Sequence, residues 1–417
     1  MHRIILLTLL SSCISVATAQ RDTSAYSRFA TAANRSNLYA GIRHSIGFLS
    51  TPLTDSTEEV WEDAFSSMEL VYHTSPWEES RLRFAFDSLA YRSPRFQRAF
   101  IEVVFTCYPT QFNKEINSFL TRVSNEKVFA MCAEYLLRGN DDSLSRQNLF
   151  TVMQTKFHDF RHPILLSLAK KLTDPPLPIP DLSSFFDHTY LTGNVVLFSF
   201  QRKNRDYPGL VIVRDTKGDL IRNTDGSVFY VAQLARSLSN LPGYLTDGST
   251  PQGIFRMKGF DVSRSSFIGP TTNIQLTMPG EATLQHLMKD SSITDSIWTE
   301  AWYAKLLPQK LRPYFPIYGS YFAGMAGRTE IIAHGTTVDP DYYRSRKFFP
   351  YTPTEGCLCT KEIWNPGDGR RIESDQQKLV NAIKKAGGPD GYCIVLEIND
   401  DQRPVTLEDV LTLTSIK

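Results

Sequence analysis

The residues with the clearest chemical potential are one histidine and one cysteine late in the chain, each beside a glycine. His334 is followed by Gly335, and Cys357 ends the run TEGC. A thiol becomes a good nucleophile when a nearby imidazole accepts its proton. Glycine before the cysteine permits a sharp turn that aims successive N–H groups at one point, which suits an oxyanion. The simpler alternative is a cysteine and a histidine that never meet, because both occur in ordinary cores.

The stretch from residue 331 to residue 361 resembles the active-site segment of the L,D-transpeptidases, the cysteine acyltransferases of bacterial peptidoglycan. That family carries a His-Gly pair followed by Ser/Thr-x-Gly-Cys, matched here at 334–335 and 354–357. Its upstream Thr-Pro-x-Gly-x-Phe turn is matched by TPQGIF at 250–255. The resemblance extends roughly over residues 193–410, a little over half of the chain.

The resemblance implies a role for each residue of the motif. Cys357 is expected to be the nucleophile and His334 the general acid and base. The carbonyl of Gly335 is expected to orient the imidazole, and no metal or organic cofactor is needed. The backbone N–H groups expected to form the oxyanion hole are those of Glu355, Gly356 and Cys357. The residues expected to contact substrate are Tyr318, Tyr321, Arg344 and Thr354, although a solvated loop face is the alternative for Arg344.

Members of the family attack the carbonyl of a diamino acid in a peptide stem, expel D-alanine and pass the acyl group to an amine. The resemblance therefore implies an exported L,D-transpeptidase that acts on peptidoglycan stem peptides. It would form 3–3 cross-links or attach another amine. Transfer of the same acyl group to water would instead make a carboxypeptidase, endopeptidase or amidase. A non-catalytic module that binds the cell wall is the third alternative.

One position departs from the family pattern. Many members place arginine or asparagine two residues after the nucleophile, where this chain has Cys359. The difference affects a substrate contact rather than the cysteine and histidine chemistry. We expect Cys359 to be a bystander, on the argument that alternation aims its side chain differently from that of Cys357.

The elements that must position these residues lie in a β-rich second half. Runs of β-branched and aromatic residues at 195–200 and 210–213 follow the proline-rich segment DPPLPIP at 174–180. We therefore place a linker at 173–183 and a catalytic domain with strands and a few helices at 184–417. A strand is expected to end at His334. An aromatic insertion at 290–325 is expected to wall the cleft, with half or more of its rings in the core.

The first half has a different pattern. Apolar residues recur at helical spacing over residues 20–172, as in Leu82, Ala85, Phe86 and Leu89. This predicts an all-α array, HEAT-like in outline although no repeat consensus is present. Nothing in it is arranged for chemistry. We expect it either to position substrate or a protein partner, or to serve as a packing scaffold.

The N-terminus predicts export. Residues 1–19 combine a basic residue, a short apolar run and an A-x-A site, which is typical of a secretory signal leading to the periplasm or cell wall. A rival interpretation treats the run LSSC at 10–13 as a lipobox, and only a lipid on Cys13 would then give membrane contact. The net charge of +1 gives no electrostatic case for nucleic acid.

The cysteine count bears on the nucleophile. Five cysteines remain after a signal ending at residue 19, and an odd number in an exported protein leaves at least one thiol free or bonded to another molecule. Cys107 and Cys132 lie on neighbouring predicted helices and either pair or stay as buried free thiols.

Overall fold

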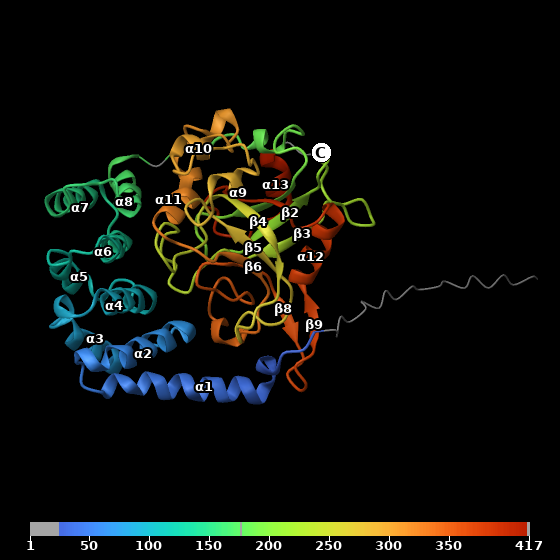
Figure 1. Cartoon of the computed structure of the whole chain (residues 1–417). Coiled ribbons are helices and arrows are strands. Elements are labelled where there is room, and N and C mark those ends of the chain that lie inside the picture. Colours follow the sequence, from blue (N-terminus) through green and yellow to red (C-terminus); the bar gives the residue numbers. More distant parts are fainter. Residues whose placement is uncertain (1–24, 176, 415–417) are drawn as a thin grey trace, which may run out of the picture.

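The computed structural model describes residues 25–175 and 177–414. The predicted signal segment 1–19, including Cys13, lies outside these described residues. Within them, no helix has the length and apolar character needed to cross a membrane. The described chain forms a helical domain followed by a domain built on a large mixed sheet (Figure 1). The expected division into a helical half and a β-rich half is confirmed.

The helical domain forms an arc along one side of the β domain (Figure 1). Its helices begin with the caps that their sequences encode: Ser93 accepts the N–H of Phe96 at the start of α4, and Pro94 takes the first helical position. One continuous apolar core, with Trp61 and Phe100 fully buried, joins the helices. The α-helices described here are α1 (Ala32–Ile46), α2 (Glu58–Val71), α3 (Pro76–Phe86), α4 (Pro94–Cys107), α5 (Asn113–Leu120), α6 (Glu126–Gly139), α7 (Ser143–Lys156) and α8 (Pro163–Thr173).

The β domain is organised on one eight-stranded sheet with the order β3-β2-β1-β10-β4-β5-β6-β7. Its strands pair antiparallel, except that β1 pairs parallel with β10 and β6 parallel with β7. Leu234 and Cys359 exchange two backbone hydrogen bonds of 2.8 Å, so the two ends of the sheet meet and it is nearly closed. The strands are β1 (Val195–Gln201), β2 (Gly209–Arg214), β3 (Tyr230–Gln233), β4 (Gly253–Asp261), β5 (Asn273–Thr277), β6 (Ile332–His334), β7 (Leu358–Cys359) and β10 (Gly391–Glu397).

Each face of the sheet has its own apolar core, because successive side chains of a strand point to opposite faces. One face packs on α12, through side chains such as Leu379 and Ile383. The other packs on the remaining helices of this domain. Strand β1 is buried along its whole length, which explains its mainly apolar sequence. The other elements are α9 (Leu284–Met288), α10 (Glu300–Ala304), α11 (Gly319–Met325), α12 (Asp375–Ala386), α13 (Leu407–Thr414), and the hairpin of β8 (Glu362–Trp364) and β9 (Arg371–Ser374).

The two domains interlock through residues 241–249, a loop of the β domain that inserts into the helical arc. Leu241 and Leu245 are fully buried within the apolar core of the helical domain. Beside them, Arg98 of α4 forms an ion pair of 2.8 Å with Asp247. The helical domain is therefore in direct contact with the part of the β domain that precedes the turn at 250–255.

Four carboxyl groups gather at this junction. Glu69 of α2 and Glu102 of α4 face Asp247 and Glu355 of the β domain. Burial, followed by repulsion from the neighbouring carboxylates, raises the pKa of both Glu69 and Glu102 well above the ordinary value. Glu102 is 9% exposed. Ionisation of Glu69 or Glu102 therefore destabilises the contact between the two domains.

The Glu102→Gln variant should be more stable than the wild type at pH 8 and nearly equal to it at pH 5. A carboxyl group whose pKa is raised by folding contributes less to the stability of the protein as the pH rises from its pKa in the unfolded state, about 4.5, through its pKa in the folded state. Glutamine has nearly the same shape as glutamate but carries no charge. The free energy of unfolding at pH 8 should therefore rise by on the order of 1 kcal/mol. Thermal unfolding at the two pH values measures the difference.

Glu59→Gln is the matched control, because Glu59 is exposed on α2. It should give no gain that depends on pH. A Glu102→Gln protein that is less stable than the wild type at pH 8 would contradict this account of the junction.

Candidate active site

Cys357 lies at the end of a tight turn that leads into β7. The hydroxyl of Thr354 accepts the N–H of Gly356 and donates to the carbonyl of Cys357, both at 3.0 Å. Gly356 has a φ of +113°, and a Cβ atom there would lie 1.9 Å from the Nη2 atom of Arg328. The hydroxyl of Thr250 donates to the carbonyl of Gly356 at 2.8 Å. Contacts on both sides therefore fix the turn, and only glycine fits at its centre.

The turn presents two free backbone donors rather than the three expected from the sequence. The N–H of Gly356 is already bonded to the hydroxyl of Thr354, as in the local turns that threonine commonly makes. The N–H groups of Glu355 and Cys357 have no acceptor among the described residues. Glu355 and Cys357 are therefore the donors available to an oxyanion here, and Gly356 is not.

His334 is the last residue of β6 and is 4% exposed. Its Nδ1 atom lies in hydrogen-bond contact with the carbonyl of Gly335, the backbone partner expected from the sequence. A carbonyl oxygen only accepts, so Nδ1 carries the proton and Nε2 is the basic nitrogen. Burial lowers the pKa of the imidazole to about 4. His334 is therefore a neutral ring with its basic nitrogen fixed by the fold.

The two strands bring the cysteine beside the histidine strand. In the parallel register of β6 and β7, Ala333 lies opposite Leu358, and both face the core of α12. Alternation therefore turns the side chain of His334 to the opposite face of the sheet. The sulfur of Cys357 accepts the N–H of Ile332 at 3.5 Å, so it lies against β6 itself. No hydrogen bond joins the sulfur to the imidazole in the described contacts.

The thiol and the imidazole are both neutral at pH 7. Burial raises the pKa of the Cys357 thiol to about 11, although the N–H of Ile332 and the guanidinium of Arg328 act in the opposite direction. A thiol with this pKa is a weak nucleophile until its proton is removed. Any attack by Cys357 therefore requires a base, and Nε2 of His334, at the end of the strand that the sulfur contacts, is a candidate for that role.

Arg328 is a functional candidate that sequence reasoning missed. It is buried just before β6, and burial lowers the pKa of its guanidinium to about 10. It forms no ion pair with a described carboxylate and is close enough to Cys357 for each to influence the ionisation of the other. A buried cation at this position favours the thiolate. Its hydrogen-bond acceptors are the carbonyl groups of Gly243, Leu245, Gly248 and Ser249.

The enclosure of Cys359, rather than the direction of its side chain, distinguishes it from Cys357. Residues two apart on a strand share a face, so alternation does not separate the two side chains. Burial distinguishes the two cysteines instead. Cys359 is fully enclosed, its sulfur lies 3.7 Å from the hydroxyl of Thr352, and burial raises the pKa of its thiol to about 12. Cys357 keeps partial exposure. Cys107 and Cys132 are free thiols, so no bridge joins them.

The structure corrects two of the expected substrate contacts. Tyr318 and Tyr321 are buried and pack against Tyr303 in the core of the β domain, because the 3-10 turn at Phe315–Tyr318 and the short helix α11 that follows it turn them inward. Each of the two side chains is 7% exposed among the described residues, so little of either ring is open to a ligand. Arg344 forms an ion pair of 2.8 Å with Asp341 on an exposed loop. Thr354 shapes the cysteine turn through its hydroxyl, as described above.

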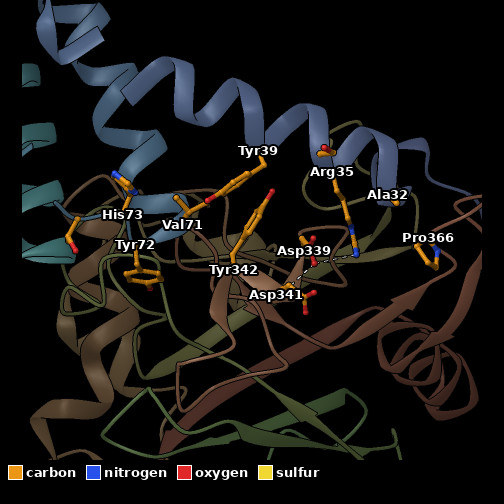
Figure 2. A pocket seen from close by; sticks show the side chains of 12 residues that line it. Ala32, Arg35, Tyr39, Val71, Tyr72, His73, Asp339, Asp341, Tyr342 and Pro366 are labelled. Carbon is orange, nitrogen blue, oxygen red and sulfur yellow. Dashed lines mark hydrogen bonds and ion pairs between the residues drawn. The ribbon is translucent and has the colours of Figure 1, made fainter. Parts of the chain in front are cut away.

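The helical domain holds the loop between His334 and Cys357. Figure 2 shows Tyr39 of α1 beside Tyr342 of this loop, and their rings stack with centroids 5.9 Å apart. Arg35 of the same helix forms an ion pair of 3.4 Å with Asp339. A cavity of about 740 Å³ lies between the helix and the loop. The segment that links the two candidate catalytic residues is therefore anchored outside its own domain.

Comparison of the chain with protein-family models, with curated proteins and with solved structures gives no match. The functional conclusion therefore rests on the residues and geometry of this chain.

The Gly356→Ala variant should lose both stability and thiol reactivity. Alanine at a φ of +113° is strained, and its methyl group would collide with Arg328. Gly388→Ala is the matched control, because Gly388 has a φ of +106° with no atom within 4 Å of the added Cβ. We expect Gly356→Ala to cost about 1–3 kcal/mol more than Gly388→Ala.

Denaturant unfolding measures this difference in stability. The rate of Cys357 alkylation by iodoacetamide measures the reactivity of the thiol that the turn presents. Equal stability losses in the two variants, with unchanged alkylation, would show that the turn does not depend on the space at Gly356.

Proposed function

We propose that this chain is an exported L,D-transpeptidase that acts on peptidoglycan stem peptides through a Cys357 thioester. The observation that carries the proposal is that a fixed base and a thiol that needs one both lie at strand β6. Nε2 of His334 is left basic by the contact of Nδ1 with Gly335, on the strand against which the sulfur of Cys357 lies. The family motifs at 334–335, 354–357 and 250–255 supply the reaction class.

In the first half of the reaction, Nε2 of His334 accepts the thiol proton as the sulfur of Cys357 attacks the carbonyl carbon of the donor stem. The N–H groups of Glu355 and Cys357 stabilise the oxyanion that forms, and Arg328 adds a positive field behind the turn. The amide C–N bond then breaks. The proton on Nε2 passes to the leaving amine, and D-alanine departs.

In the second half, Nε2 of His334 accepts a proton from the acceptor amine, and the nitrogen of this amine attacks the carbonyl carbon of the thioester. The C–S bond breaks and the thiolate takes back the proton, which restores the neutral pair. Water in place of the amine would release the free acid. The acceptor of the acyl group, an amine or water, therefore decides between transpeptidase and hydrolase. The product of the reaction identifies this acceptor.

The proposed setting follows from the sequence. Residues 1–19 carry the export signal, so the enzyme would work in the periplasm or cell wall. We propose that the HEAT-like arc, which contacts the loop after His334 and the 241–249 loop, fixes the shape of the site.

The direct test uses the purified mature protein with a disaccharide-tetrapeptide that carries a diamino acid at its third position. The wild type and Cys359→Ala should both form a cross-linked dimer with release of D-alanine, detected by mass spectrometry. Cys357→Ala should form none, and His334→Ala should be slower by about 10²–10⁴-fold because the base is lost. A tripeptide without dimer would identify the hydrolase. Turnover by Cys357→Ala would contradict the proposal.

The pH profile tests the assignment of the base. Because burial lowers the pKa of His334 to about 4, the imidazole stays unprotonated well below neutral pH. The value of kcat/KM should therefore hold between pH 7 and about 5 and fall only below that. Circular dichroism at each pH controls for unfolding. A half-loss of kcat/KM near pH 6.5, the ordinary value for histidine, would mean that the catalytic imidazole is not the buried one.

A further inference from the structure

Glu362 of β8 is a buried carboxyl group that the proposed chemistry does not use. Its side chain has no exposed surface. The carboxyl group lies against the backbone of Gly335, because a Cβ atom added to that glycine would be 2.2 Å from Cδ of Glu362 and 2.3 Å from its Oε2 atom. A side chain at position 335 would therefore occupy the place of this carboxyl group, which accounts for the glycine after His334.

Three partners hold one oxygen of this carboxyl group in place. The Oε1 atom accepts the hydroxyl of Thr271 at 2.6 Å and the hydroxyl of Ser374 at 2.5 Å. The guanidinium of Arg371 lies 3.9 Å from the same oxygen and donates to the hydroxyl of Thr271 at 2.8 Å. A buried side chain with these partners does not swing away from Gly335, so its contact with the backbone is a fixed part of the structure.

The second oxygen faces the peptide group that joins Gly335 to Thr336. Oε2 is the carboxyl oxygen closer to Gly335. It has no hydrogen bond of ordinary geometry among the described residues, but the N–H of Thr336 is near enough to lower the pKa of the carboxyl group. Glu362 therefore attracts this N–H electrostatically.

The same peptide group supplies the carbonyl that orients His334. In a planar trans peptide, the C=O and N–H bonds point in opposite directions. An oxygen of Glu362 beside the N–H of Thr336 therefore turns the carbonyl of Gly335 to the other side, where Nδ1 of His334 contacts it. No backbone–backbone hydrogen bond among the described residues involves either this carbonyl or this N–H.

The backbone of His334 is fixed separately. The N–H of Thr360 donates to the carbonyl of His334 at 3.0 Å, and the amide of Gln376 in α12 donates to the carbonyl of Ala333 at 2.9 Å. The imidazole therefore stands on an anchored strand end. The direction of the next peptide group then decides whether Nδ1 has an acceptor.

We propose that Glu362 is a positioning residue of the candidate active site, which sets the direction of the Gly335 carbonyl and thereby keeps the proton of His334 on Nδ1. The role rests on the proposed function, because the position of this proton matters only if Nε2 must be free to act as a base. Glu362 acts through the backbone and through His334, and it has no part in the bonds that form and break.

The positioning does not require Glu362 to be ionised. Burial raises its pKa to about 7, although its hydrogen bonds with Ser374 and Thr271 act in the opposite direction. A protonated carboxyl group still presents an acceptor oxygen, and its O–H can donate to a hydroxyl. The N–H of Thr336 therefore faces an acceptor in both protonation states.

The test compares Glu362→Gln with Glu362→Asp. Glutamine keeps the length of the side chain and one acceptor oxygen, while its amide can donate to the hydroxyls of Thr271 and Ser374. Aspartate keeps the negative charge beside Arg371 but is one methylene shorter, so it cannot hold these hydroxyls and reach the peptide group together. The ¹⁵N chemical shifts of the His334 ring, assigned by their absence in His334→Ala, report the tautomer in the full mature chain.

The wild type and Glu362→Gln should both show the Nδ1–H form of His334, and Glu362→Asp should show mainly the Nε2–H form. With the disaccharide-tetrapeptide as substrate, Glu362→Asp should lower kcat by about tenfold without changing KM, because the substrate still binds but the basic nitrogen is seldom free. Glu362→Gln should stay within about twofold of the wild type. A role of Glu362 as no more than the counter-ion of Arg371 predicts the reverse order of the two variants.

Ser374→Ala is the control for a purely structural effect. It removes a hydroxyl that caps α12 and bonds the same carboxyl group, so it should lower the unfolding temperature without changing the His334 shifts. If Glu362→Asp does not fold, Glu362→Met fills the same space without an acceptor and should show the same change of tautomer.

Three results would overturn the positioning role. The first is a wild type without the Nδ1–H form. The second is an Nδ1–H form that persists in Glu362→Asp or in Glu362→Met. The third is a change of tautomer that Glu362→Gln or Ser374→Ala shows as strongly. A wild type that gives the expected shifts but no turnover would contradict the proposed function instead, because the shifts are measured without substrate.

Discussion

A buried guanidinium bonded to backbone carbonyls is the interaction on which the rest of the structure depends. Burying a cation away from water is unfavourable unless its donors are satisfied. Arg328 meets this requirement without a carboxylate, because the 241–249 loop curls its carbonyl groups around it. The same guanidinium fills the space beside Gly356. One side chain therefore joins the loop, the cysteine turn and the start of the histidine strand.

The loop that surrounds Arg328 is itself held by the helical domain. Leu241 and Leu245 pack in the helical core, and Asp247 pairs with Arg98. On the other side, α1 stacks on the loop that connects His334 to Cys357. The helical domain thus supports the site at two places, although none of the candidate catalytic residues lies in its described part. Its removal would expose the apolar residues of the 241–249 loop and release the cage of carbonyls, so we regard the two domains as one functional unit.

The sequence predicted what depends on local chemistry. Glycine before Cys357 and threonine three residues ahead of it encode a short-range turn, which the structure forms. The carbonyl of Gly335 contacts Nδ1 of His334, as the motif predicted. The change from helical to strand periodicity located the two halves. Patterns of this kind extend over a few residues, so they can be recognised in the sequence without knowledge of the fold.

Other features depend on contacts between distant segments. The described hydrogen bonds of Arg328 all go to backbone carbonyl groups. No pattern of side chains in the sequence predicts such contacts. Closure of the sheet comes from a pairing of Leu234 with Cys359 across 125 positions of chain. Tyr318 and Tyr321 were expected at the cleft from their place before the histidine strand, but the 3-10 turn that ends at Tyr318 and helix α11 turn them into the core. Gln252 was expected only as part of a turn, whereas the structure buries its amide without a partner among the described residues.

The central claim is that Cys357 is an activated nucleophile and that the enclosed Cys359 is not. The most direct measurement is the intact mass of the folded mature protein after incubation with a carbapenem, whose strained lactam carbonyl traps an attacking thiol as a thioester. The account predicts a single adduct on the wild type and on Cys359→Ala, and none on Cys357→Ala. A folded wild type without adduct, or an adduct that persists in Cys357→Ala, would contradict it.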